Sequence, residues 1–204
     1  TLRLWNVDTG STLRLFRSPK GSIAGQGLSR DGNYVTATFD DGLVVVWAVE
    51  GLTPTSVRQA HTWNINSIAW NKDGSEILTS AGDGSAMLTD ANSSMLLFAM
   101  KPGGAGVYNA VFTPDGKQII MSDDARQVKI FSATTGDEVR TLTTLEDGWM
   151  PYWVAVTPDG KQVAVATYGG VRMYVYASGQ QVKLLAAPDT TLFAMGMSPD
   201  GRYV

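Results

Sequence analysis

The residue types that most often carry out catalysis are scarce in this sequence. Cysteine is absent, and His61 is the one histidine among 204 residues. Thiolate catalysis, disulfides and thiolate metal sites are therefore excluded. An imidazole can act as a base or a ligand, but a metal rarely binds a lone histidine without histidine or cysteine partners. We expect no metal site, no cofactor and a structural role for His61.

Two pairs of neighbouring carboxylates, Asp40-Asp41 and Asp123-Asp124, offer a second kind of chemistry. Such pairs can do acid–base work or bind Ca²⁺, but no D-x-D-x-D-G loop accompanies them. Aspartates also bond their own backbone in tight turns. Residues 103–106 (Gly-Gly-Ala-Gly) lack the strand-then-helix context of a phosphate-binding loop, and Gly-x-Ser-x-Gly is absent. The pattern favours turns and connections, and no catalytic residue is predicted.

The aromatic segment at residues 148–153 is a candidate binding surface. It reads Gly-Trp-Met-Pro-Tyr-Trp and contains Trp149, Tyr152 and Trp153. Large rigid rings are enriched in binding hot spots, but they also dominate packed cores. The alternative to a binding site here is packing between structural units.

The composition limits the class of partner. Charged residues make up 17% of the chain and the net charge is −3, which gives no electrostatic reason to expect nucleic acid or an anionic membrane. No stretch approaches the roughly 20 apolar residues of a membrane span. The cysteine-free, charge-poor composition leans towards an exported or periplasmic bacterial protein without fixing the compartment.

An Asp-Gly pair recurs along the whole chain at intervals of 41 to 44 residues. Three of the pairs lie in near-identical words, Thr-Pro-Asp-Gly-Lys twice and Ser-Pro-Asp-Gly-Arg once. Proline sets φ at the entry of a turn and glycine supplies a positive φ at its exit, so each word predicts a hairpin turn. The aspartates of the five pairs are Asp31, Asp73, Asp115, Asp159 and Asp200.

A second marker keeps the same period. It is a strand-like dipeptide that ends on an aromatic residue in four of five cases: Leu4-Trp5, Val46-Trp47, Leu88-Thr89, Ile130-Phe131 and Met173-Tyr174. Each period then contains four short strands, a to d. Strand a precedes Asp-Gly, strand b follows it, strand c ends near the aromatic residue, and strand d follows a second turn. Four-stranded units at this period are typical of β-propeller blades, which predicts an all-β fold of antiparallel blades.

These residues also resemble the WD-repeat family. Residues 2–6 (Leu-Arg-Leu-Trp-Asn), followed by Asp8-Thr9-Gly10, are similar to the close of a WD repeat, as are residues 44–47 (Val-Val-Val-Trp). The likeness covers essentially the whole chain, but its pattern is degenerate, and the Gly-His pair of the family is represented by Ala60-His61. The Pro-Asp-Gly-Lys words resemble bacterial propellers, so the chain is interpreted as a divergent, prokaryotic-like WD-type propeller.

The resemblance implies a buried network around His61. In WD repeats a histidine, an aspartate of the b–c turn, a serine or threonine of strand b and the strand-c tryptophan are joined by hydrogen bonds. The positions that match here are His61, Asp83 and either Ser80 or Thr79. Thr89 replaces the tryptophan, so the network should lack one member.

The resemblance also implies a shared rim. In the geometry of the family the d–a and b–c connections lie on one rim, which would bring Trp63 and Tyr168 towards Trp149, Tyr152 and Trp153. We expect a non-enzymatic scaffold that binds a protein or peptide there. The alternatives are a small-ligand or enzymatic site in the central channel, which rests on fold analogy alone, and a purely structural domain.

The strand count predicts an open array. The chain begins with strands c and d, contains four full blades and stops within strand b, which gives four full blades and two half blades. Joining the two ends would leave nine positions between Asp200 and Trp5, where a full blade has sixteen. Residues 1–204 are therefore expected to be one segment of a larger propeller, about seven blades being usual for the family. This segment should belong to a larger multidomain chain or to a complex.

Overall fold

The computed structural model describes residues 1–17, 22–51 and 53–204. Every regular element in these ranges is a β-strand, and no helix among them is long and apolar enough to cross a membrane. All strand pairs are antiparallel, and neighbours in sequence are neighbours in each sheet. The all-β fold of antiparallel blades predicted from the Asp-Gly period is confirmed.

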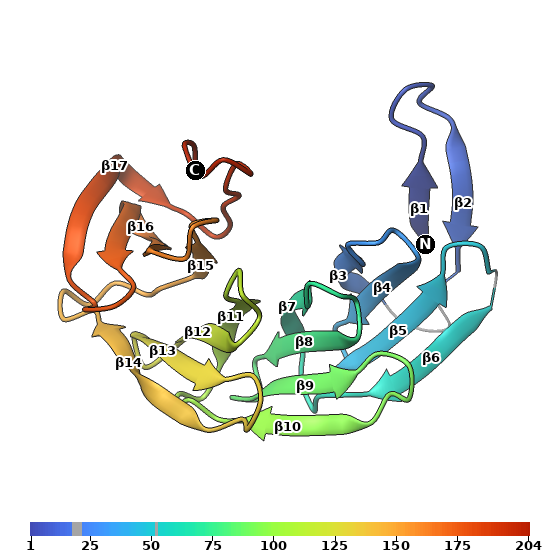
Figure 1. Ribbon diagram of the computed structural model, residues 1–204, viewed down its shortest axis with the longest axis horizontal. Coiled ribbons are helices and arrows are strands. Elements are labelled where there is room, and N and C mark those ends of the chain that lie inside the picture. The colour runs from blue at the N-terminus through green and yellow to red at the C-terminus, as the bar shows by residue number, and fades with distance from the viewer. Residues whose placement is uncertain (18–21, 52) are drawn as a thin grey trace.

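Two strands and three four-stranded blades account for most of the chain (Figure 1). The N-terminal hairpin contains β1 (Leu2–Trp5) and β2 (Thr12–Phe16). Blade 1 contains β3 (Ile23–Leu28), β4 (Tyr34–Phe39), β5 (Leu43–Ala48) and β6 (Pro54–Gln59). Blade 2 contains β7 (Ile65–Trp70), β8 (Glu76–Ala81), β9 (Ala86–Asp90) and β10 (Leu96–Met100). Blade 3 contains β11 (Val107–Phe112), β12 (Gln118–Asp123), β13 (Gln127–Ser132) and β14 (Glu138–Thr144).

Blade 4 contains three elements, β15 (Trp153–Val156), β16 (Gln162–Val175) and β17 (Gln181–Thr191). The first part of β16 pairs with β15 and its second part with β17. The Tyr176 N–H donates to the Lys161 carbonyl, so β16 doubles back on itself. Gly169 and Gly170 lie at the bend, both with positive φ. β16 thus supplies the predicted strands b and c in one element.

The Asp-Gly words form the predicted turns between strands a and b. In blade 3 the Asp115 carboxylate accepts hydrogen bonds from the Thr113 hydroxyl at 2.6 Å and the Lys117 N–H at 3.1 Å. The Gly116 N–H closes the turn on the Thr113 carbonyl, with a φ of 72° that glycine adopts without steric cost. The same pattern of bonds recurs at Asp31, Asp159 and Asp200. A short local sequence motif therefore forms the same turn in successive blades.

The cores lie between the blades. One cluster joins blades 2 and 3 through side chains such as Leu88, Met100 and Ile119, and another joins blades 3 and 4 through Ile130 and Val154. In blades 2 and 3, apolar residues on both faces of the sheet are buried because a neighbouring blade covers each face.

Side-chain hydrogen bonds join the inner strands of neighbouring blades. The Ser67 hydroxyl accepts the Ala110 N–H at 3.1 Å, and the Asn109 amide oxygen accepts the Val154 N–H at 3.0 Å. These bonds tie β7 to β11 and β11 to β15.

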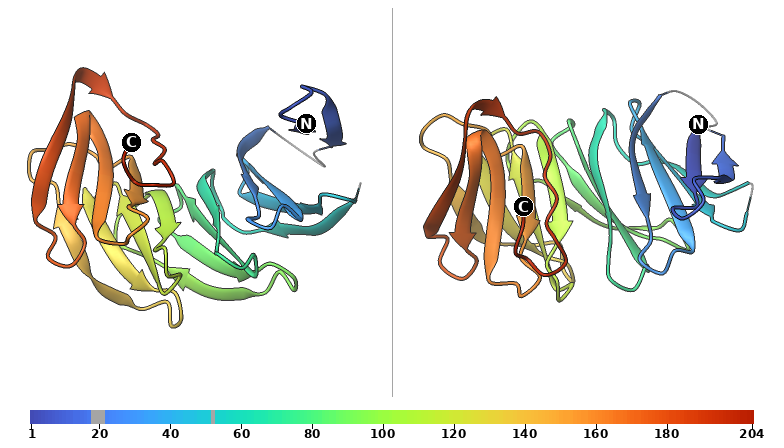
Figure 2. Two further views of the ribbon diagram at one scale, coloured as in Figure 1. Left: turned by 45° about the horizontal axis from the view of Figure 1, so that its top comes forward. Right: turned by 90° about the horizontal axis from the view of Figure 1, so that it is seen from above.

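The blades follow one another along an open arc, with β3, β7, β11 and β15 on its concave side (Figure 1). Figure 2 shows the N-terminal hairpin and the C-terminal segment at opposite ends of that arc. β1 and β2 pair with each other in a sheet of their own, so no blade is built from both ends of the chain.

The second half blade differs from the prediction. Residues 192–204 form the a–b turn around Asp200 but contain no strand. Leu192, Met195 and Met197 instead pack against the core of blade 4. A strand needs a neighbour for its backbone hydrogen bonds, and within the described residues no strand pairs with this segment.

The alternation of antiparallel strands places the connections on two rims. The a–b and c–d turns lie at one end of each blade, and the b–c turns and d–a connections lie at the other end. We call the second the d–a rim. His61 and the aromatic candidates all lie on or close to it.

Candidate functional site

His61 lies at the start of the connection from β6 to β7, inside the protein. Its side chain is 1% exposed. Nε2 lies 2.7 Å from the Thr79 hydroxyl, and Nδ1 lies 3.0 Å from the Ser85 hydroxyl and 3.2 Å from the Asp83 carboxylate. Burial lowers the pKa of His61, although Asp83 opposes this. A neutral ring with its proton on Nδ1, accepting from Thr79 at Nε2, satisfies these partners.

Asp83 holds the other side of this network. Its carboxylate accepts the Thr62 N–H at 3.0 Å, the Ser85 N–H at 3.1 Å and the Ser85 hydroxyl at 2.6 Å. Burial favours the neutral acid, but the hydrogen bonds from Ser85 and Thr62 lower the pKa of Asp83. The network thus connects the d–a connection before blade 2 to the b–c turn of that blade.

One member of the expected network is corrected by the structure. Thr79, not Ser80, contacts His61, because successive strand residues point to opposite faces of β8. The Ser80 hydroxyl bonds the Ser67 hydroxyl of β7 at 2.7 Å instead. Ser85 was not predicted. Its place two residues after Asp83, where an aspartate bonds its own turn, is the signal that could have revealed it.

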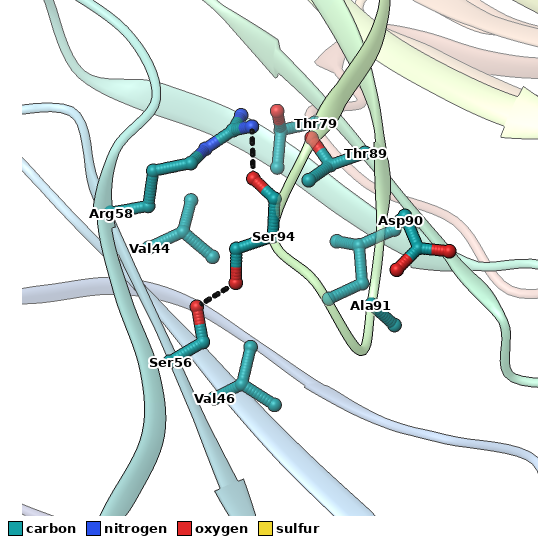
Figure 3. A pocket seen from close by; sticks show the side chains of 10 residues that line it. Val44, Val46, Ser56, Arg58, Thr79, Thr89, Asp90, Ala91 and Ser94 are labelled. Atoms are coloured by element: carbon teal, nitrogen blue, oxygen red, sulfur yellow. Dashed lines mark hydrogen bonds between the residues drawn. The ribbon is translucent and has the colours of Figure 1, made fainter.

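Thr89 lies beside a small cavity between blades 1 and 2 (Figure 3). The cavity has a volume of about 20 Å³ and is lined by Val44, Val46, Thr79 and the stem of Arg58, among others. The Arg58 guanidinium donates to the Ser94 carbonyl at 3.3 Å. At the equivalent position of blade 1, Trp47 is fully buried against Phe16 of β2, with ring centroids 5.7 Å apart. Threonine therefore leaves a gap that a ring fills in the preceding blade.

The aromatic candidates occupy different environments on the d–a rim. Trp149 is 39% exposed and stacks on Tyr168, with ring centroids 4.3 Å apart. Tyr152 and Trp153 are half-buried, so Trp149 is the exposed ring of the three at 149–153. Trp63 is 64% exposed, and no ring contact within the described residues joins it to the others.

Two further rings belong to this surface and were not predicted. Tyr152 contacts Tyr108 of β11 at 5.3 Å and Phe193, beyond β17, at 5.0 Å between ring centroids. Phe193 is 68% exposed. Tyr108 and Tyr152 precede the equivalent inner-strand residues Asn109 and Trp153, so aligning the blades could have found Tyr108. The rings form two groups in contact, Trp149 with Tyr168, and Tyr152 with Tyr108 and Phe193. Both groups lie on the d–a rim, and we call these five rings together the rim cluster.

Carboxylates surround the rim cluster. The Tyr168 hydroxyl donates to Asp189 at 3.4 Å, and Asp147 pairs with Arg172. Burial, followed by the negative charge of Asp124, raises the pKa of Tyr108. The surface is thus aromatic and locally anionic.

The paired carboxylates lie in b–c turns, as expected. The Leu43 N–H donates to Asp41 at 3.3 Å, and the Gln127 N–H donates to Asp123 at 2.9 Å. Burial raises the pKa of Asp123. No group of three or more histidine, aspartate or glutamate side chains able to hold a metal occurs in residues 1–17, 22–51 and 53–204.

Residues 52–90 match the family model for the WD domain, G-beta repeat. These residues resemble a WD40 repeat. The matched stretch runs from the end of blade 1 through β9 and includes His61, Thr79, Asp83 and Ser85. It is therefore the stretch with the polar network that the family resemblance implied.

Known proteins are similar to this chain in sequence or in fold. The WD repeat-containing protein slp1 of Schizosaccharomyces pombe is 22% identical over 98% of this chain and 51% of its own length. The human apoptotic protease-activating factor 1 is 24% identical over 79% of this chain and 13% of its length. The β-propeller domain of Cps50 (Swd1) from Myceliophteria thermophila superposes with a TM-score of 0.84 at 20% identity, over 93% of this chain and 62% of that one. The chain thus spans about half the length, or less, of these two curated relatives.

These relatives come from eukaryotes, so the prokaryotic character expected from the Pro-Asp-Gly-Lys words is not supported. Those words encode a turn that any lineage can use, because proline and glycine meet its backbone requirements. The bacterial origin suggested by composition is likewise not supported by these relatives.

Proposed function

We propose that this chain is a non-enzymatic interaction scaffold that binds a protein or peptide on its d–a rim. The observation that carries the proposal is the rim cluster. Within it, Trp149 is exposed while held flat against Tyr168, and Phe193 is exposed while held against Tyr152. A ring fixed by one neighbour and open on its other face offers contact area at little cost in conformational entropy.

The family likeness supports the same function. WD-repeat propellers typically act as platforms in protein assemblies, and the relatives named above share that architecture. Trp63 extends the proposed surface towards blade 2, because it lies on the same rim and is exposed. Trp153 is the first residue of β15 and is half-buried, so we assign it to the packing beneath the binding surface and not to the main contact with the partner.

Replacing Trp149 with alanine tests the proposal. We expect Trp149→Ala to weaken partner binding by about 2 kcal/mol, as loss of a hot-spot ring does, while the thermal unfolding temperature changes little. Quantitative mass spectrometry of proteins co-purified with the wild-type and variant chains would identify the partner. Titration calorimetry with that purified partner would then give the affinities.

Trp5→Ala is the matched control, because Trp5 is 52% exposed but lies on the N-terminal hairpin, away from the rim cluster. The control should retain the partner. If both variants bind the partner as the wild type does, the d–a rim is not the binding surface. If only Trp5→Ala loses it, the surface lies at the N-terminal end of the arc.

A further inference from the structure

We propose that the rim cluster binds a basic segment of its partner, with an arginine or lysine side chain over Trp149 and Tyr168 and against Asp189. This inference rests on the proposed function and adds the chemistry of the partner. It arises from how charge is arranged around the rings.

The carboxylate of Asp189 lies at the edge of the Trp149–Tyr168 stack. The two rings are 21° from parallel, and the Tyr168 hydroxyl reaches Asp189. An exposed ring face with a carboxylate at its edge attracts a cation twice, through the ring quadrupole and through the negative charge. Asp189 is exposed and forms no ion pair within the part of the chain that the structure describes.

The remaining carboxylates of this surface reinforce the negative field. Glu146 is exposed beside the loop that carries Trp149, and Asp124 faces Tyr108 closely enough to raise its pKa. Neither has an ion pair among the described residues. The negative charge of Asp147 is neutralised by its ion pair with Arg172.

Two basic side chains also lie on this rim. Lys101 and Arg126 are exposed, in the connection before β11 and the b–c turn of blade 3, and neither pairs with a described carboxylate. Both belong to the blade 3 side of the rim, whereas Asp189 is the carboxylate that meets the Tyr168 ring edge in blade 4. The charge at the Trp149–Tyr168 stack itself is therefore negative, which favours a cationic side chain there and opposes the phosphates of nucleic acid.

Asp189 allows a conservative test of this charge. Its backbone has a φ of 56°, in the left-handed region that aspartate and asparagine tolerate better than most residues. Asp189→Asn therefore keeps the backbone conformation and an oxygen that accepts the Tyr168 hydroxyl, and removes only the charge. Asp137→Asn is the matched control, because Asp137 is exposed in the c–d turn of blade 3, on the opposite rim.

The probes are three fluorescein-labelled peptides of about nine residues, in which serine alternates with arginine, lysine or glutamate. Fluorescence anisotropy with the whole chain should show binding of the arginine and lysine peptides, weakening as salt rises, and none of the glutamate peptide. Asp189→Asn should weaken binding about five- to tenfold, with Trp149→Ala weakening it further, while Asp137→Asn matches the wild type.

Three outcomes would overturn the inference. They are equal binding of all three peptides, no effect of Asp189→Asn, or rim-dependent binding of a single-stranded oligonucleotide in place of the basic peptides. Failure here is separable from failure of the proposed function. A natural partner lost in Trp149→Ala, together with basic peptides that do not bind, would reject the basic segment and keep the scaffold.

Discussion

His61 shows how one polar residue can serve a fold without doing chemistry. It is fully buried and contacts Thr79, Asp83 and Ser85, which come from a strand and a turn of the same blade. A buried imidazole is stable only when its nitrogens are bonded, and all three partners meet that need. The network therefore fastens the connection before β7 to the b–c turn of blade 2.

Replacing His61 with alanine should destabilise the chain by about 1–3 kcal/mol, because it leaves the buried Thr79 hydroxyl without its partner and removes one of the partners of Asp83. Urea unfolding followed by circular dichroism would measure the change. Partner affinity should stay within about twofold of the wild type once folding is accounted for. A loss of binding with unchanged stability would give His61 a functional role instead.

The same residue should make stability depend on pH. Burial lowers the pKa of His61 below its usual 6.5, so below that pH the unfolded chain binds a proton that the folded chain does not. The stabilisation is present above pH 6.5 and is lost as the pH falls towards the folded-state value. Subtracting the unfolding free energies of His61→Ala from those of the wild type between pH 8 and 5 isolates this contribution. A flat difference would contradict it.

At the scale of the element, the turns differ in what determines their conformation. Some are formed by hydrogen bonds among their own residues, and others are constrained by contacts with residues far away in the chain. The a–b turn around Asp115 is built by its own residues, and Gly116 faces open space. The b–c turn of blade 1 differs, because Gly42 is packed against the d–a connection. A Cβ at Gly42 would lie 2.1 Å from the His61 carbonyl oxygen.

Two glycine substitutions separate these effects. Both positions have a positive φ, 84° at Gly42 and 72° at Gly116, so alanine costs about 1 kcal/mol of backbone strain at either. Gly42→Ala adds a clash with backbone and should destabilise by about 2–4 kcal/mol in total. Chemical unfolding of the two variants side by side tests this. Equal losses would show that the connection around His61 moves aside freely.

For the whole molecule, the two ends of the open arc lack a neighbouring blade. Trp5 of the N-terminal hairpin is 52% exposed, whereas the residues at the same place in blades 1, 3 and 4, Trp47, Phe131 and Tyr174, are 1% to 3% exposed. Those three pack against the preceding hairpin or blade, which Trp5 lacks within the described residues. We propose that residues 1–204 belong to a larger propeller whose further blades cover these ends, in line with relatives that extend beyond the matched region.

Expressed alone, the 204 residues should therefore associate as their concentration rises and should bind the apolar dye ANS, since exposed apolar patches drive both. A longer chain that continues the array should be monomeric and unfold at a higher temperature. Light scattering and calorimetry on the two chains measure these properties. A monomeric short chain that binds no dye would contradict the proposal.

The sequence by itself determined the features that depend on neighbouring residues. The Asp-Gly words specify their turns through bonds that span five residues, and their period revealed the number and order of the blades. His61 and Asp83 could be placed through the WD resemblance. The aromatic segment at residues 148–153 could be singled out as a candidate surface from its composition alone.

Only the tertiary structure decided what depends on residues far apart in the chain. Thr79 and not Ser80 belongs to the His61 network, because the orientation of β8 selects which of its side chains face His61. Phe193 joins Tyr152 across some forty residues, and Asp189 meets Tyr168 where β17 passes the bend of β16. The last segment has a turn without strands, because strand formation requires a partner and the turn does not. Periodicity predicts which surfaces exist, and packing between blades decides which side chains share them.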